Sequence, residues 1–356
     1  MSEQKLSLIE LEFPALEALL TSWGAPKYRA RQVWDWLYIH KATSFNHMAN
    51  LPQSLRDQLS TTADIGTLTI LATLQSSDGE TRKDLLQLAD GESIEVVLMR
   101  YERRRTACIS TQVGCAIGCE FCATGQMGFR RNLSVGEITA QVVHCARILQ
   151  DEGDRLTNVV FMGMGEPLLN YDATLAAIRR LIDPQTLGIG QRHITLSTVG
   201  IIPGIARLAQ EPGQQADTHL QVTLAISLHA ATDELRNRLV PINRQNGLDA
   251  LFAACQNYAE LTNRRISFEW ALIEGLNDTE EQAAALVRRL SGLRAHVNLI
   301  LINPTRAYPG RPPSQARVTG FTDILDRHNI PYTLRLRRGT DIEAGCGQLR
   351  QRHDDN

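Results

Sequence analysis

The sequence has no long hydrophobic run, and no window approaches the ~20 consecutive apolar residues that a transmembrane helix needs. It also lacks the basic and apolar segments of a secretory signal, since its first residues read MSEQKLSLIE. Basic residues are not in excess, and the net charge of -2 differs from the strongly basic charge of many nucleic-acid-binding proteins. We therefore expect a cytoplasmic protein without a membrane segment, in which any basic surface is local.

The seven cysteines lack the context of a disulfide framework, because no export signal accompanies them. Metal binding, redox chemistry and core packing remain as their roles. The composition, with 43% hydrophobic and 21% charged residues, is that of an ordinary globular protein. At 356 residues the chain exceeds one typical domain, so we expect a large catalytic domain with a smaller appendage.

Three patterns follow one another along the chain. Residues 1–66 have the periodicity of amphipathic helices and predict a small accessory domain. Residues 67–107 contain short β-rich runs separated by Asp-Gly turns and predict hairpins. In residues 108–346, apolar strand-length runs alternate with helical runs, which predicts an α/β fold with a parallel sheet covered by helices. The expected strands lie near 158–162, 193–197, 222–228, 266–272, 297–302 and 332–336, and the expected helices near 135–149, 172–181, 201–210, 248–261, 279–293 and 315–328.

Polar residues at the ends of several predicted strands favour a barrel over an open sheet. Such residues are Glu166, Ser197, His229 and Asn303. In barrel enzymes the catalytic groups come from the C-terminal ends of several strands. One polar residue in a loop is ordinary, but four in equivalent places indicate a shared site.

One loop carries three thiols within eight residues, those of Cys115, Cys119 and Cys122, and glycines beside them give the backbone freedom. Three soft ligands this close suit an iron-sulfur cluster or most of a zinc site. A structural zinc site needs a fourth Cys or His at finger-like spacing, and none is near in the sequence. A cluster with three protein ligands leaves one iron open, as catalytic metal sites do. Three structural core cysteines are the remaining alternative.

The pattern Cys115-x3-Cys119-x2-Cys122, with Phe121 before the last cysteine, resembles the signature of the radical-SAM superfamily. Within it, the whole chain resembles the dual-specificity RNA adenine-C2 methyltransferases. The resemblance implies a partial (β/α)6 TIM-like radical-SAM barrel at 108–346, with an N-terminal helical RNA-binding domain at 1–66, a β-hairpin extension at 67–107 and a tail at 347–356. It is carried by CISTQVGCAIGCEFCATGQMGFRRNL (108–133), MGMGEPLLN (162–170), DIEAGCGQL (341–349), SLHA (227–230) and residues 24–38.

The resemblance implies two cofactors. Cys115, Cys119 and Cys122 would bind a [4Fe-4S] cluster, and the amino and carboxylate groups of S-adenosylmethionine (SAM) would chelate the fourth iron. Further residues match the family's SAM contacts, and several are the strand-end residues noted above. They are Gly165, Glu166, Ser197, Ser227, Leu228, His229 and Asn303.

The chemistry explains why such an enzyme needs two more cysteines. Carbon 2 of adenine is electron-poor and cannot attack a sulfonium methyl as nitrogen or oxygen would. The resemblance implies that Cys346 accepts the methyl from one SAM, and that a radical from a second SAM removes a hydrogen atom from it. The resulting carbon radical joins RNA to protein, and release needs a base and a thiol. Glu95 matches the proton acceptor, and Cys108 matches the thiol that forms a transient disulfide with Cys346.

Other residues have more ordinary interpretations. Without the resemblance, Glu95 would be a solvated strand carboxylate and Cys108 a core residue. Cys145 and Cys255 lie in predicted helices, match no family role and are expected in the core. Gly345 departs from the family, where a slightly larger residue is expected before Cys346, and we expect a looser loop there.

Four basic clusters are candidates for contact with RNA, and one of them is interleaved with aromatic residues suited to stacking. The alternative is that the aromatics pack in a core and the arginines are simply solvated. The clusters are Lys27, Arg29 and Arg31 (with Tyr28, Trp34, Trp36 and Tyr38), Arg103 to Arg105, Arg130 and Arg131, and Arg335, Arg337 and Arg338.

The implied substrates are an adenosine in the peptidyl-transferase region of 23S rRNA and the adenosine 3′ of the anticodon in tRNAs, reached by extruding the base. We also expect an electron donor such as flavodoxin or ferredoxin, and a monomer. Three alternatives remain open: a C8-methylating antibiotic-resistance relative with the same cysteines, a non-catalytic zinc-stabilised RNA-binding module, and a radical enzyme acting on a protein or metabolite. The carrier-cysteine motif disfavours the last.

Overall fold

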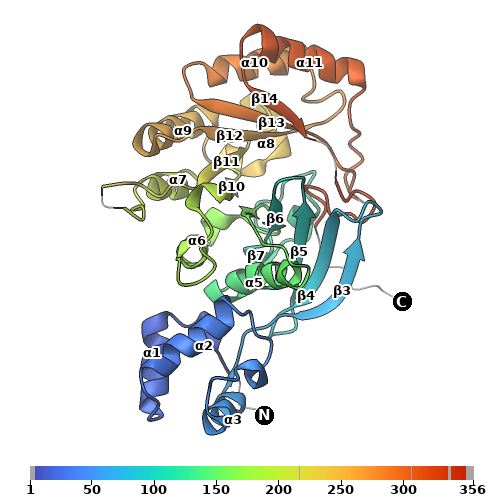
Figure 1. Ribbon diagram of the computed structural model, residues 1–356. Helices are drawn as coiled ribbons and strands as arrows, with labels where there is room; N and C mark the ends of the chain where they lie inside the picture. The colour runs from blue at the N-terminus through green and yellow to red at the C-terminus, as the bar shows by residue number, and fades with distance from the viewer. Residues whose placement is uncertain (1–4, 216, 306, 336–337, 350–356) are drawn as a thin grey trace.

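A single large sheet forms the centre of the molecule. The structure is a computed structural model that describes residues 5–215, 217–305, 307–335 and 338–349. Within these residues, ten strands pair in the order β14-β13-β12-β11-β10-β9-β6-β5-β4-β3 (Figure 1). Their bounds are β3 Thr69–Gln75, β4 Thr81–Gln87, β5 Ser93–Arg100, β6 Arg105–Cys108, β9 Asn158–Phe161, β10 Ile194–Thr198, β11 Thr223–Ser227, β12 Ile266–Leu272, β13 Ala295–Leu301 and β14 Tyr332–Arg335.

The strands from β6 to β14 are parallel and alternate with helices, so the predicted α/β fold is confirmed. β12 lies where the sequence places it, because its continuous apolar run is buried on both faces. β10 begins one residue late, because a short 3-10 helix precedes it. The end of the last predicted strand, Leu336, lies outside the described residues. The helices are α5 Val135–Asp151, α6 Tyr171–Ile182, α7 Ile202–Ala209, α8 Asp233–Leu239, α9 Leu248–Thr262, α10 Glu280–Leu290 and α11 Gln315–Arg327, of which α8 was not anticipated.

The β-rich region joins this sheet instead of standing apart from it. β3, β4, β5 and β6 pair in antiparallel succession, and β6 pairs in parallel with β9. The hairpins therefore continue the barrel sheet toward the edge strand β3, at the right of Figure 1. A second, two-stranded sheet joins β7 (Gln112–Gly114) to β8 (Phe129–Asn132) on either side of the cysteine loop. The loop also contains the short helix α4 (Ala123–Gln126).

The N-terminal residues form a helical unit at the lower left of Figure 1. Trp34 and Tyr38 are buried in its core, so the packing interpretation is confirmed for these two aromatic residues, while Tyr28 is 57% exposed. Ala140 and Val143 of α5 belong to the same core, which joins the unit to the barrel. No helix in the described residues is long and apolar enough to cross a bilayer. The unit comprises α1 Phe13–Ser22, α2 Tyr28–Tyr38, α3 Gln53–Thr62 and the paired strands β1 Leu6–Ser7 and β2 Ala63–Asp64.

Candidate active site

The three motif cysteines lie in the loop between β7 and β8. Gly114, which precedes the first of them, has a φ of +73°, and a Cβ there would lie 1.9 Å from the carbonyl oxygen of Gly128. Only glycine therefore allows the loop to close against its own end, where the Cys115 amide donates to the same carbonyl at 2.9 Å. Burial raises the pKa of the Cys115 thiol to about 12, and it also raises the pKa values of Cys119 and Cys122. Without a bound metal, these groups are thiols at neutral pH.

All three cysteines line one large cavity. Its volume is about 1120 Å³, part of which is open to solvent, and this is large enough for a cofactor. The C-terminal ends of β10, β11, β12 and β13 contribute to the wall, as expected for a barrel enzyme. The C-terminal segment closes the remaining side through Cys346, Gly347 and Leu349.

The three cysteines supply the thiolates that a cluster with one open iron needs. Around one zinc ion every sulfur lies within ~2.3 Å of the same point. A cluster instead binds each thiolate through a different iron, so the sulfurs stand further apart. Among the described residues, no group of three or more His, Cys, Asp or Glu side chains has the geometry for one metal ion.

Glu166 is a buried carboxylate in the cavity wall. Its two oxygens accept hydrogen bonds from the amides of Leu168 at 3.0 Å and Val199 at 2.9 Å. Burial raises the pKa of Glu166 to about 7, against the lowering effect of these hydrogen bonds. The preceding Gly165 has a φ of +99°, and a Cβ there would collide with Gln112. The pair is suited to hold a cationic group.

His229 and Asn303 present polar atoms to the same space. Burial lowers the pKa of His229 to about 3, so the ring is neutral, and its Nδ1 accepts from the Ala271 amide at 3.0 Å. Asn303 donates to the carbonyl of Cys346 at 3.2 Å, while its Oδ1 has no partner in the described residues. A polar cofactor bound in the cavity would supply the hydrogen-bond donor that this buried oxygen lacks.

The other predicted SAM contacts divide into two groups. The hydroxyls of Ser197 and Ser227 lie 3.3 Å apart and both residues line the cavity. Leu228 does not line it: its side chain is fully buried behind the wall. The structure therefore brings together six of the seven predicted contacts in one wall, and any role of Leu228 would come from its backbone.

Cys346 lies in the cavity, exposed to it and held by backbone contacts. The carbonyl of Gly347 accepts from the Ala123 amide at 2.8 Å, which fixes the segment beside the cysteine loop. Gly345 is closely packed, because a Cβ there would lie 2.5 Å from the Asn303 amide nitrogen. The missing methyl group leaves room for the Asn303 side chain, and the looser loop expected at Gly345 stays a prediction.

Cys108 and Cys346 lie within electrostatic reach of each other although they are far apart in the sequence. Both are free thiols in this structure. Burial raises the pKa of Cys108 to about 12, and the neighbouring Cys346 adds to the effect. Cys108 is buried at the end of β6 and is absent from the cavity wall. Cys145 and Cys255 are buried in α5 and α9, as expected for core thiols.

Glu95 is buried behind the wall and is not solvated. It is 2% exposed and forms an ion pair with Lys83, whose Nζ lies 3.0 Å from a carboxylate oxygen. Lys83 of β4 and Cys108 of β6 are both paired with Val97 of β5, so the three side chains lie on the same face of the sheet. Glu95 lies on this face too, because it is two residues before Val97 on β5. Lys83 was not predicted from the sequence; a lysine at an inward position of a buried strand is the signal that could have identified it.

Glu269 is a second site residue that was not predicted from the sequence. It lies in the apolar strand β12, is 5% exposed and lines the cavity. One oxygen accepts from Asn298 at 2.7 Å and lies 3.9 Å from Arg335, while Oε2 has no partner in the described residues. Burial raises the pKa of Glu269. A lone carboxylate inside a continuous apolar run was the available signal.

A partial barrel whose cysteine loop and strand ends share one cofactor-sized cavity defines the class of radical-SAM enzymes. Residues 109–287 match the family model of the radical SAM superfamily. Residues 6–65 match that of the ribosomal RNA large subunit methyltransferase (RlmN) N-terminal domain. The chain belongs to the RlmN family of radical-SAM RNA methyltransferases, and its cofactors are a [4Fe-4S] cluster and SAM.

Similar proteins cover nearly the whole chain. The dual-specificity RNA methyltransferase RlmN 1 of Myxococcus xanthus is 49% identical over 98% of this chain and 95% of its own length. The ribosomal RNA large subunit methyltransferase N of Nitrosopumilus maritimus is 45% identical over 94% of this chain and 95% of its own length. The crystal structure of a radical SAM methyltransferase from Sphaerobacter thermophilus superposes with a TM-score of 0.93 and 48% identity, covering 97% of this chain and 99% of that one.

Proposed function

We propose that this enzyme methylates carbon 2 of an adenosine in 23S rRNA and of the adenosine 3′ of the anticodon in tRNAs, with Cys346 as the methyl carrier. The observation that carries the proposal is the position of Cys346, an exposed thiol in the cavity that the motif cysteines also line. The names of the similar proteins, which include a dual-specificity RNA methyltransferase and a ribosomal RNA methyltransferase, support rRNA as a substrate and more than one kind of RNA target.

Each site residue has a proposed task. Cys115, Cys119 and Cys122 hold the cluster. When bound, the cluster and SAM supply the electron, the methyl group and the radical chemistry. Glu166 accepts a hydrogen bond from the amino group of SAM, because its carboxylate is fixed by two amides and faces the cavity. The remaining SAM contacts are Gly165, Ser197, Ser227, Leu228 through its backbone, His229 and Asn303.

Release of the product would use residues behind the cavity wall. Glu95 takes the proton from carbon 2, and Lys83 holds the Glu95 carboxylate in place. Cys108 then loses its proton and attacks the sulfur of Cys346: a disulfide forms between the two cysteines, the bond from that sulfur to the RNA-bound carbon breaks, and the carbon keeps the electron pair and takes up a proton to become the methyl group. The proximity of these thiols supports this step. An external reductant must then restore both thiols before the next cycle.

The proposed function also assigns a role to each part of the chain, a location and an electron donor. We propose that residues 1–66 contribute to RNA binding, that 67–107 extend the sheet, that 108–346 form the catalytic barrel and that 347–356 form a tail. Seven free cysteines and an RNA substrate support a reducing, cytoplasmic location. A flavodoxin or ferredoxin would deliver electrons to a monomeric enzyme.

Nucleoside analysis tests the regiochemistry and the substrates together. Anaerobically reconstituted enzyme is incubated with SAM, a reductant and either 23S rRNA fragments or tRNA, and the digested nucleosides are separated and weighed against standards. The proposal predicts 2-methyladenosine from both RNAs. Formation of 8-methyladenosine would instead identify the antibiotic-resistance activity, and absence of methylated adenosine from tRNA would restrict the enzyme to rRNA.

A further inference from the structure

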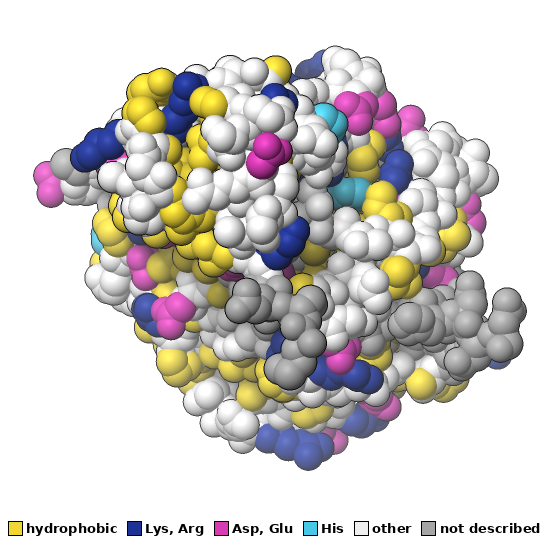
Figure 2. All heavy atoms as spheres, turned by 90° about the horizontal axis from the view of Figure 1, so that it is seen from below, with side chains coloured by type: hydrophobic (Ala, Val, Ile, Leu, Met, Phe, Trp, Pro, Cys, Tyr) yellow, Lys and Arg dark blue, Asp and Glu magenta, His cyan; other side chains and the backbone are white. Residues whose placement is uncertain are grey.

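The basic cluster of the N-terminal helical unit is largely compensated by its own surroundings. Lys27 forms an ion pair with Glu17 at 3.5 Å, and Arg31 pairs with Asp35 at 2.9 Å. The Arg29 guanidinium donates to a glutamine side chain and to a backbone carbonyl. On the face shown in Figure 2, Lys and Arg side chains stand in separate small groups, with Asp or Glu beside several of them. This unit therefore offers no continuous basic band on that face.

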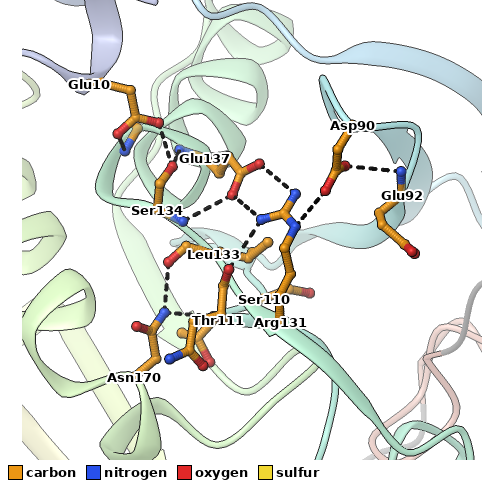
Figure 3. Close-up of polar contacts among 12 residues, drawn as sticks. Glu10, Asp90, Glu92, Ser110, Thr111, Arg131, Leu133, Ser134, Glu137 and Asn170 are labelled. Atoms are coloured by element: carbon orange, nitrogen blue, oxygen red, sulfur yellow. Dashed lines mark hydrogen bonds and ion pairs between the residues drawn. The ribbon is translucent and has the colours of Figure 1, made fainter.

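The cluster at Arg130 and Arg131 has a structural task. Arg131 lies between two carboxylates (Figure 3): its Nε is 2.6 Å from Asp90, and its two terminal nitrogens are each 2.8 Å from Glu137. Arg130 pairs with Glu92 at 2.7 Å. Through these ion pairs β8 contacts the start of α5, at Glu137, and the turn before β5, at Asp90 and Glu92. An RNA phosphate would have to displace them, so this pair is a poor candidate for RNA contact.

The cluster at the turn between β5 and β6 is different. The guanidinium carbon of Arg104 lies 4.1 Å from the centre of the Tyr101 ring, and that of Arg338 lies 4.6 Å from the same centre. Neither arginine, nor the exposed Arg103, forms an ion pair within the described residues. Stacking on a ring orients a guanidinium while leaving its N–H groups available to an anion.

Two acidic residues near this turn are engaged by other arginines, while Glu102, in the turn itself, is exposed, forms no ion pair within the described residues and is offset by the adjacent Arg103. Arg100 pairs with Glu152 at 2.5 Å, and Arg105 pairs with Asp154 at 2.6 Å. Asp78 is near enough to feel the charge of Arg338 but forms no ion pair with it in the described structure. The Tyr101 stack, which we define as Tyr101, Arg104 and Arg338, thus keeps a net positive charge in a chain whose overall charge is -2.

The Tyr101 stack lies on the same side of the molecule as Cys346, the proposed methyl carrier. Arg335 is within electrostatic reach of both Tyr101 and Cys346, and it lies 3.9 Å from Glu269 in the cavity wall. The stack and Cys346 are also joined through the chain, because Arg338 begins the described segment 338–349 that carries Cys346. A strand of RNA with its target base in the cavity would have its backbone near this stack.

We propose that the Tyr101 stack binds phosphate groups of the RNA substrate beside the nucleotide that enters the cavity; this inference rests on the proposed function. Guanidinium groups pair with phosphate in planar, bidentate geometry. Phosphate contacts position an RNA without reading its bases. A backbone contact of this kind would serve rRNA and tRNA alike, which base-specific contacts would not.

RNA binding by the full-length, anaerobically reconstituted enzyme tests the inference. A fluorescent 23S rRNA fragment containing the target adenosine is titrated with wild-type enzyme, Arg104→Ala, Arg338→Ala and the double variant at several salt concentrations. Each lost phosphate contact should weaken binding about fivefold at about 0.1 M salt and reduce the slope of log K against log salt by about 0.7 to 1. The control is Arg265→Ala, which removes an exposed arginine that has no ion pair in the described part of the chain and lies just before β12, separated from β6 by three strands.

The outcomes separate the two proposals. Wild-type affinity and salt slope in Arg104→Ala would overturn the phosphate stack; this variant is informative on its own, because the Arg104 side chain makes no hydrogen bond in the described structure. Arg338 donates to a backbone carbonyl at 3.0 Å, so Arg338→Ala is accepted only with an unchanged melting temperature. If the variants bind normally while the wild type methylates RNA, only the stack is refuted. A wild-type enzyme that neither binds nor methylates RNA would refute the proposed function and the stack with it.

Discussion

Lys83 and Glu95 form a buried ion pair on adjacent strands, with 3.0 Å between Lys83 Nζ and a carboxylate oxygen of Glu95. The same Nζ donates to the carbonyl of Glu343 at 3.1 Å. Glu343 lies three residues before Cys346, so one ammonium group contacts both the proposed base and the segment of the methyl carrier. Lys83 is therefore placed to keep Glu95 in register with Cys346.

This pair predicts a non-additive effect on stability. Lys83→Met removes an ammonium group from beside a buried carboxylate and should lower the free energy of unfolding by about 3–5 kcal/mol, and Glu95→Gln removes the carboxylate from beside the buried ammonium group with the same kind of penalty. The double variant buries no charge at this place, so its loss should be smaller than the sum of the single losses. Denaturant unfolding of the four proteins gives the comparison. Simple addition of the two losses would show that the pair is not energetically coupled.

The raised pKa of Glu166 predicts that SAM binding depends on pH. Its pKa of about 7 means that the carboxyl group is neutral below that pH and charged above it. Only the charged form attracts the amino group of SAM, so the dissociation constant for SAM should rise about tenfold per pH unit once the pH falls well below about 7. Calorimetric titration of the reconstituted enzyme measures this, and Glu166→Gln should bind weakly without the pH dependence. A flat profile in the wild type would refute the role of Glu166.

Two glycines of the cysteine loop form a matched pair for a test of cluster assembly. Gly114 and Gly118 both have positive φ values, but only at Gly114 would a Cβ meet another atom, at 1.9 Å from a carbonyl oxygen. Gly114→Ala should prevent the loop from closing and reduce the bound iron severely. Gly118→Ala should cost only the ~1–2 kcal/mol of the left-handed conformation and keep its iron. Equal iron contents in the two variants would contradict this account of the loop.

The proximity of Cys108 to Cys346 predicts what happens when the second thiol is removed. Cys108→Ala should still accept the methyl group on Cys346 and join to RNA, but it cannot attack the Cys346 sulfur to release the product. A covalent protein–RNA species should accumulate and be visible on a denaturing gel. Cys145→Ala removes another buried thiol, 1% exposed in α5, and should turn over without this species. Accumulation in both variants, or in neither, would argue against a resolving role for Cys108.

The repeated strands and helices were predictable because their periodicity is local. Each barrel strand is a short, continuous apolar run, and β12 matches its prediction at both ends. α8 was missed, because its seven residues, DELRNRL, contain too few turns to show an apolar stripe. The joining of β3 to β5 with the barrel sheet was not visible, since it depends on the pairing of β6 with β9 across the whole of α5.

The site was predictable where its residues belong to short motifs, and much less so where they meet through the fold. The three motif cysteines and the strand-end residues Ser197, Asn303 and His229 do line one cavity. Lys83 and Glu269 were not predicted because their interaction partners, Glu95 and Asn298, lie on neighbouring strands that are distant in the sequence. The same holds for the arginines, since the sequence does not show that Arg131 is held by carboxylates while Arg104 stacks on Tyr101 without one.

The carrier role of Cys346 is the central claim, and one variant tests it directly. Cys346→Ala keeps the three motif cysteines, and the alanine retains the backbone contact to Asn303, so the protein should bind iron and SAM as the wild type does. With radiolabelled SAM, the wild-type peptide that contains Cys346 should carry label and pass it to RNA, whereas Cys346→Ala should label neither. Methylated RNA from a Cys346→Ala enzyme with full iron content would contradict the account.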